Sequence, residues 1–228
     1  MAAVAGFGIG SLLTPLLATQ VPLKLAVAAV SIPHLIATAL RFWLLRAHVD
    51  RKLLLSFGLF SAAGGLLGAL AHKFASSPAL AIVFGAALLL AGTSELTGAA
   101  RKVRLHGAVA WVAGALSGVL GGMVGNQGGI RSAALLGFQT TRATFVATAT
   151  AIALLVDGAR MPVYLWLEAD ALLRLARPIA IASAGCVLGT LWGRRVLERL
   201  PETAFRRLVA SLILLLGAYM LAAGIGAL

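Results

Sequence analysis

Long apolar runs separated by short polar segments dominate this amino-acid sequence. A helix needs about 20 consecutive apolar residues to cross the hydrocarbon core of a membrane. The apolar runs lie at residues 2–19, 23–45, 53–73, 79–97, 106–138, 141–157, 173–193 and 204–227. The pattern predicts an all-α membrane protein with several transmembrane helices.

The run at 106–138 is too long for one span, and a glycine-rich segment interrupts it. This segment reads Gly125-Asn126-Gln127-Gly128-Gly129-Ile130-Arg131-Ser132. Polar, irregular backbone at membrane depth is tolerated only where it is buried in protein or lines a cavity. The pattern therefore predicts either a broken helix that crosses the bilayer or a re-entrant hairpin that returns to its own side.

The placement of Lys and Arg favours the hairpin. Cytoplasmic loops of inner-membrane proteins carry an excess of these residues. A hairpin puts the basic loops at 46–52, 101–104 and 194–207 on one side, whereas a full crossing divides the basic residues almost evenly. We therefore expect a multi-pass protein of the bacterial inner membrane with its C-terminus on the outer face.

Composition agrees with a surface that faces lipid. The chain is 61% hydrophobic and 11% charged, whereas soluble domains are about 45–50% apolar and about 25% charged. The net charge of +12 lies in short clusters suited to anionic lipid head groups, so we expect no nucleic-acid partner. The single cysteine, Cys186, excludes an internal disulfide and a multi-cysteine metal site, and we expect no cofactor. No signal-peptide pattern begins the chain.

An ordered set of matches relates the two halves of the chain. With a shift of 119 positions, Gly6, Gly10, Gln20, Val27, Ala28 and Arg41 fall on Gly125, Gly129, Gln139, Val146, Ala147 and Arg160. At slightly larger shifts, Gly64, Gly68 and Gly92 fall on Gly185, Gly189 and Gly217. We predict repeats at 1–98 and 99–228, each a glycine-broken or re-entrant element followed by three transmembrane helices. A hairpin and three crossings per repeat give inverted topology, a common plan in secondary transporters.

The first repeat is shorter than the second in this comparison. Met1 falls on Leu120, so residues 106–119 have no counterpart. Either the natural start lies upstream of Met1, or the first repeat has half a hairpin.

Arg131 is the strongest candidate for a substrate contact. A charge inside a span costs about 2.5–3.5 kcal/mol on insertion scales, so its presence needs a reason. We expect an anion site in which Arg131 supplies a fork of donors. Its expected partners are backbone and side-chain donors of Asn126, Gln127, Gly128, Gly129 and Ser132. The alternative is that Arg131 extends to the interface and the glycines only permit close packing.

The matching element of the first half carries no charge. It runs Gly6-Phe7-Gly8-Ile9-Gly10-Ser11, with Thr14 and Pro15 following. Ligand contacts there would come from backbone N–H groups and hydroxyls, with Gly8, Gly10, Ser11 and Thr14 as candidates. Glycine packing is the alternative.

Four ionisable residues are candidates for coupling or gating. Asp157 stands at the end of the run 141–157, and Arg160 follows at helical spacing. The two either pair with each other, or carry a proton and contact the anion. His34, beside Pro33 in mid-run, is a candidate proton relay or an ordinary hydrogen-bonded residue. Arg41 completes the set.

These motifs resemble those of the sulfite exporter TauE/SafE family, over nearly the whole chain. The signatures are Phe7-Gly8-Ile9-Gly10 running to Pro15, and Leu116-Ser117-Gly118-Val119-Leu120-Gly121 running into Gly128-Gly129. The resemblance implies a compact transporter with two pseudo-symmetric halves. It also implies that the substrate is sulfite, an organosulfonate or a related small anion, and it suggests export.

Other functions make different demands on the candidate residues. A proton-coupled importer or exchanger of another organic anion would use the same residues, and a homo-oligomer is possible. A non-transporting scaffold would tolerate loss of Arg131. A Ser117–His106 dyad is excluded because eleven helical residues separate them by about 16 Å, so we predict no enzyme. A sulfur relay would require Cys186.

Overall fold

The chain folds as a bundle of helices. The computed structural model describes residues 9–99, 105, 107–125, 128–136, 138, 140–197 and 202–228. Every regular element among these residues is helical, as predicted. The elements are α1 (Ile9–Leu17), α2 (Leu23–Leu45), η1 (Arg46–His48), α3 (Arg51–Leu53), η2 (Leu54–Gly58), α4 (Leu59–Phe74), α5 (Ser77–Thr97), α7 (Gly107–Val124), α8 (Gly128–Leu136), α9 (Arg142–Arg174), α10 (Ala176–Leu197) and α11 (Glu202–Gly226).

Six helical stretches in the described part are long and apolar enough to cross a membrane. They are Leu23–His48, Arg51–Phe74, Ser77–Thr97, Gly107–Val124, Ala143–Arg174 and Arg207–Gly226. The apolar part of α10, Ala176–Trp192, is shorter. Exposed large side chains such as Trp43, Leu90 and Trp166 lie on the outside of these helices, as expected for a surface in contact with lipid.

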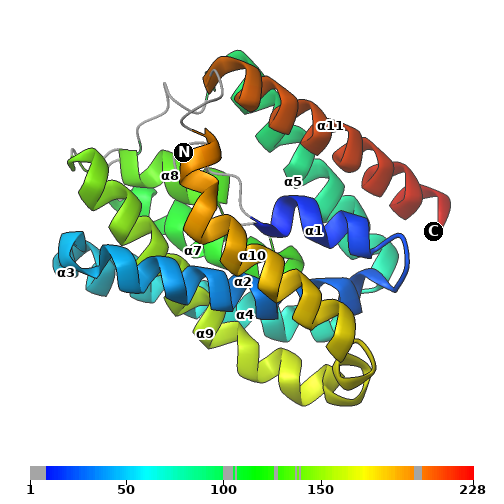
Figure 1. Ribbon diagram of the computed structural model, residues 1–228. Helices are drawn as coiled ribbons and strands as arrows, with labels where there is room; N and C mark the ends of the chain where they lie inside the picture. The colour runs from blue at the N-terminus through cyan, green and yellow to red at the C-terminus, as the bar shows by residue number, and fades with distance from the viewer. Residues whose placement is uncertain are drawn as a thin grey trace.

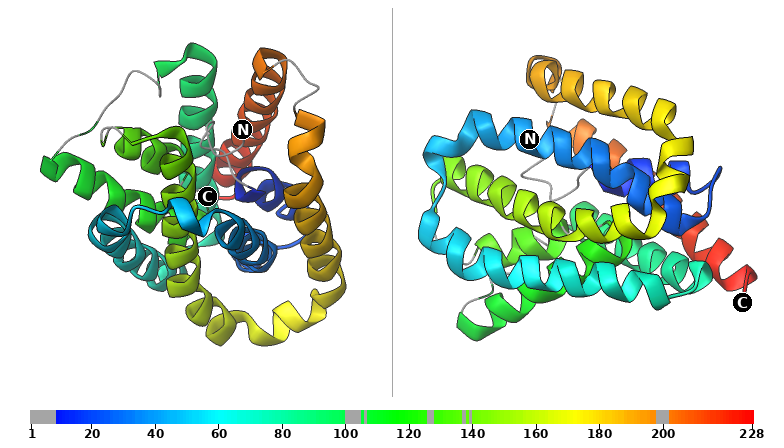
Figure 2. Two further views of the ribbon diagram at one scale, coloured as in Figure 1. Left: turned by 60° about the vertical axis from the view of Figure 1, so that its left-hand side comes forward. Right: turned by 90° about the horizontal axis from the view of Figure 1, so that it is seen from below.

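Helices α2, α4 and α9 form the middle of the bundle (Figures 1 and 2). α9 packs against both α2 and α4. α7 covers α4, α10 covers α2, and α5 and α11 run side by side as a third pair. The short α1 lies between α2 and α11. Residues from both halves of the chain therefore share one core, which includes Val27, Phe84, Tyr164 and Ile213.

The predicted break in the run 106–138 is present. α7 ends at Val124, Gly125 has φ +74°, and α8 begins at Gly128. Glycine is the residue that adopts this left-handed conformation without strain, which explains its place at the end of α7. α8 has nine residues, about 14 Å at the helical rise, and is too short to span a bilayer. Re-entry of this element remains a prediction.

Helix α9 departs from the predicted boundaries. The apolar pattern ended a span at Asp157, but the helix continues from Arg142 to Arg174 with a kink at Glu168, where the backbone is non-helical. Thr141 caps its start by accepting a hydrogen bond from the backbone N–H of Thr144. Asp157 therefore lies near the middle of the helix. The pattern failed because it treated two charged residues of one helix as a loop signal.

Glycines permit very close packing of α4 against α7. A Cβ on Gly64 would lie 2.2 Å from the carbonyl oxygen of Ala115, and a Cβ on Gly68 would lie 2.1 Å from that of Val119. Facing them, a Cβ on Gly118 would lie 2.0 Å from the carbonyl oxygen of Ser61. Backbone approach of this kind is how membrane helices associate without a hydrophobic driving force. It fixes α7 in the position from which its C-terminal end reaches the middle of the bundle.

We predict that Gly118→Ala destabilises the protein by about 1–3 kcal/mol, because the added methyl group forces α4 and α7 apart. The matched control is Gly185→Ala on α10, where a Cβ meets no atom within 4 Å and the helix gains about 1 kcal/mol from the better helix former. Thermal unfolding of both variants in detergent measures the difference. Equal melting temperatures would show that the α4–α7 contact does not limit stability.

Candidate functional site

Two glycine-rich elements from opposite halves of the chain meet in the bundle. A Cβ on Gly10 of α1 would lie 2.6 Å from the carbonyl oxygen of Gly125, so the backbones touch. The hydroxyl of Thr14 and the Nη1 atom of Arg160 both lie beside Gly125, 3.7 and 3.8 Å from where its Cβ would be. Gly10, Ser11 and Thr14 are buried. The structure thus brings the first candidate element against the second.

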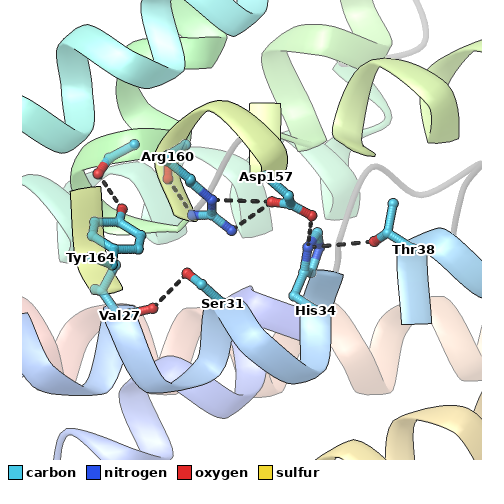
Figure 3. A network of polar contacts seen from close by, with 9 residues as sticks. Val27, Ser31, His34, Thr38, Asp157, Arg160 and Tyr164 are labelled. Carbon is cyan, nitrogen blue, oxygen red and sulfur yellow. Dashed lines mark hydrogen bonds and ion pairs between the residues drawn. The ribbon is translucent and has the colours of Figure 1, made fainter. Parts of the chain in front are cut away.

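A buried ion pair lies next to this meeting point (Figure 3). Asp157 is 0% exposed and Arg160 is 1% exposed. The Nε and Nη2 atoms of Arg160 donate to the same carboxylate oxygen of Asp157, at 3.1 and 2.7 Å. Two charges can be buried in this way only when each has its hydrogen bonds satisfied. Asp157 and Arg160 therefore pair with each other, which is the first of the two alternatives that the sequence left open.

His34 of α2 contacts the other oxygen of the same carboxylate. Its Nδ1 atom lies 2.6 Å from Oδ2 of Asp157, and the hydroxyl of Thr38 lies 3.5 Å from the same nitrogen. The side chain of His34 is 14% exposed, while that of Asp157 is fully buried. Because an ionised carboxylate only accepts, Nδ1 donates to it. The histidine is thus the more accessible member of the His34–Asp157–Arg160 chain of contacts.

The same region caps the C-terminal end of α7. The last carbonyl groups of a helix have no partner within the helix. Arg160 Nη1 donates to the carbonyl oxygen of Gly121 at 2.6 Å, and the hydroxyl of Tyr164 donates to that of Gly122. His72 Nδ1 lies 2.7 Å from the carbonyl oxygen of Met123 and therefore donates to it. Side chains of α9 and α4 satisfy the end of a helix that stops inside the bundle.

Arg131 differs from Arg160 in that two of its three guanidinium nitrogens have no hydrogen-bond partner among the described residues. Its Nε and Nη1 atoms are buried and form no hydrogen bond with any described residue, although the residue as a whole is partly exposed. The guanidinium lies within electrostatic reach of Asp157, Arg41 and Arg160. Buried donors without acceptors cost free energy, so this group is suited to an anion.

The other candidate residues lie around the start of α8, on α2 or outside the described residues. Gly128 is buried at the start of α8, and Gly129 follows it. Ser132 is partly buried one residue beyond Arg131, and Arg41 is partly buried on α2. Gly8, Asn126 and Gln127 lie outside the described residues.

Sequence reasoning missed two residues of this region, Tyr164 and His72. Both are buried, and their rings lie 5.4 Å apart between centroids. Tyr164 had a detectable signal, because Asp157, Arg160 and Tyr164 are spaced by three and four residues and share one face of a helix. His72 had only its position near the end of the apolar run 53–73.

The arrangement can hold an anion and a proton. Its charged groups are guanidinium, imidazole and one carboxylate, and the described residues include no group of three or more His, Cys, Asp or Glu side chains that would hold a metal ion. Free guanidinium donors bind oxyanions, and a histidine in contact with a carboxylate can exchange a proton.

A comparison with protein families gives a match over almost the whole chain. The model described as "Sulfite exporter TauE/SafE" matches residues 1–220. Neither a curated protein nor a solved structure matches the chain.

We predict that Arg160→Leu destabilises the protein by about 3–5 kcal/mol, because it leaves the carboxylate of Asp157 buried without its main partner and uncaps Gly121. The double variant Asp157→Leu/Arg160→Leu should recover part of the loss, since it removes the unpaired charge. Thermal unfolding in detergent measures both, with Arg177→Leu, an exposed position on α10, as control. A single variant as stable as the control would contradict the structural role of the pair.

Proposed function

The chain belongs to the sulfite exporter TauE/SafE family, and we propose that it is a secondary transporter of sulfite, an organosulfonate or a related small anion that works by alternating access. As a member of this family with several membrane-length apolar helices, it is a multi-pass membrane protein whose substrates are expected among sulfite-like anions. We propose the identity of the substrate, the transport mechanism and the direction of transport.

The observation that carries the proposal is the guanidinium of Arg131. Two of its nitrogen atoms are buried without a partner among the described residues, on α8, the helix that follows the break after α7. An oxyanion would accept the hydrogen bonds that the protein leaves unmade. A residue that only extended to the interface would instead have its nitrogens in contact with water or head groups.

Backbone groups of the two glycine-rich elements complete the proposed site. The backbone N–H groups of Gly128 and Gly129 lie at the start of α8, where the helix itself provides no carbonyl group to accept their hydrogen bonds. Thr14 and Ser11 supply hydroxyls from α1. We propose Asn126 and Gln127, together with Ser132 and the segment at Gly8 and Gly10, as further neutral contacts.

Alternating access follows from the proposed inverted repeats, 1–98 and 99–228. Under this scheme α2 corresponds to α9, α4 to α10, and α5 to α11. The helix contacts support it: exchanging the halves converts the α4–α9 contact into the α10–α2 contact, and leaves the α2–α9 and α5–α11 contacts unchanged. Each half would then move against the other around the site at Gly125.

We propose that a proton drives the cycle through His34 and Asp157. His34 is partly exposed and contacts a carboxylate that is otherwise held by Arg160. A proton gained by His34 would strengthen its contact with the Asp157 carboxylate, and loss of that proton would weaken the link between α2 and α9, the helices that join the two halves. We place the protein in the bacterial inner membrane as an exporter, with the C-terminus outside; import or exchange would use the same site.

We predict that Arg131→Gln weakens binding of sulfite to the purified protein by at least about tenfold, since hydrogen bonds to a charged group contribute about 1.5–3 kcal/mol. Isothermal titration calorimetry in nanodiscs measures the affinity for sulfite, sulfate and taurine. Arg46→Gln is the matched control, because Arg46 is exposed and stacks on Trp43 at 3.8 Å.

Equal sulfite affinity in Arg131→Gln and Arg46→Gln would return Arg131 to a structural role. A folded wild-type protein that binds none of these anions would favour a scaffold over a transporter.

We predict that His34→Gln removes the response of transport to a pH gradient while leaving anion binding in place, because glutamine keeps a hydrogen bond to Asp157 but carries no exchangeable charge. Flux of sulfite into proteoliposomes, with and without an imposed pH gradient, measures the response. His48→Gln, at an exposed residue of η1, should behave as wild type. An unchanged pH response in His34→Gln would exclude His34 as the proton carrier.

A further inference from the structure

The two halves of the chain carry equivalent arginines with unequal neighbours. At a shift of 119 positions, Arg41 falls on Arg160 and Thr38 falls on Asp157. Thr38 and Asp157 thus occupy equivalent positions, each three residues before its arginine and on the same face of its helix. The side chain at this position is a carboxylate in the second half and a neutral hydroxyl in the first.

This difference leaves the charge of Arg41 unbalanced. Arg160 pairs with Asp157 and donates to the carbonyl of Gly121, so its charge and its donors are used. Arg41 is partly buried, and no carboxylate in the part of the chain that the structure describes forms an ion pair with it. A guanidinium removed from water in this way favours an anion beside it.

Arg41 lies on the face of α2 that points to the site. His34, Thr38 and Arg41 are spaced by four and three residues, which places them along one stripe of the helix. His34 in this stripe contacts Asp157 at 2.6 Å, and Thr38 contacts His34. Arg41 follows one turn further along and lies within electrostatic reach of the guanidinium of Arg131.

The charges of the site therefore do not cancel. Asp157 and Arg160 neutralise each other, whereas Arg131 and Arg41 each carry a positive charge without a described carboxylate partner. Two like charges that approach each other in a poorly solvated region repel. A ligand with a single negative charge would relieve only half of this excess.

We infer that the site selects an anion with two negative charges, and that Arg41 is the residue that distinguishes such an anion from one with a single charge. This inference rests on the proposed function, because it assumes that the anion binds at Arg131. Arg131 then provides the primary contact, and Arg41 contributes the second positive charge. Sulfite as the dianion, sulfate and thiosulfate belong to the favoured class; methanesulfonate and nitrate do not.

Binding of two ligands of matched shape and unequal charge tests the inference. Sulfate and methanesulfonate have the same tetrahedral sulfur and three shared oxygens, and differ in one oxygen and one charge. Calorimetry in nanodiscs at low and constant ionic strength should give the wild-type protein at least about tenfold higher affinity for sulfate. Thiosulfate and nitrate serve as a second pair that differs in charge.

Variants assign the preference to Arg41. Arg41→Gln should remove most of the preference for sulfate, because loss of one positive charge weakens binding of a dianion more than binding of a monoanion. Arg41→Lys should keep most of the preference for sulfate, because lysine keeps the positive charge. Arg46→Gln removes a charge from the same end of α2 and serves as the control, which should keep the preference of the wild type. Arg131→Gln should weaken binding of both ligands.

The outcomes separate the inference from the function on which it rests. Equal affinities for sulfate and methanesulfonate in the wild type, with both lost in Arg131→Gln, would overturn the charge inference and leave the anion site. A preference that survives in Arg41→Gln would also overturn it, since the second charge would come from elsewhere. Binding of neither ligand, with Arg41→Lys and wild type equally stable in detergent, would reject the anion site itself.

Discussion

The centre of this protein depends on how a helix can end inside a bundle of other helices. α7 stops at Val124 in mid-bundle, and its last carbonyl groups meet no water there. Arg160, Tyr164 and His72 each donate to one of these groups, at Gly121, Gly122 and Met123. Without these donors the break would be too costly to keep, and without the break there would be no irregular backbone to face a ligand.

The buried positive charge of Arg160 must itself be balanced by a negative charge. A guanidinium that is 1% exposed needs an anion, and Asp157 supplies it from the same helix face. The pair binds α9 to the end of α7, while the second oxygen of Asp157 holds His34 of α2. One carboxylate therefore links the capping of α7 to the contact between the two central helices. A change in its protonation would act on both.

Much of the fold was predictable because its signals are local. Apolar run length gave the all-helical membrane class, and the glycines around Asn126 marked the break before α8. The length of α9 was not predictable in this way, since a charged residue ends an apolar run unless its partner is known. The caps of α7 join residues 39 to 51 positions apart. Neither hydropathy nor spacing identifies these partners, and His72 was missed for this reason; the spacing of Tyr164 from Asp157 and Arg160 placed it on their helix face but did not reveal its contact with Gly122.

The contrast between Arg160 and Arg131 explains how one small bundle can be both rigid and receptive. Both are arginines near the same carboxylate, yet only Arg160 has its donors satisfied by the protein. A satisfied arginine fixes the geometry, because removing it would expose unpaired groups on two helices. An unsatisfied arginine stores a cost that a ligand relieves on binding. The fold can bear that cost because the glycine contacts of α4 with α7 hold the surrounding backbone in place. Under the proposed function, stability and affinity therefore come from different arginines of one cluster.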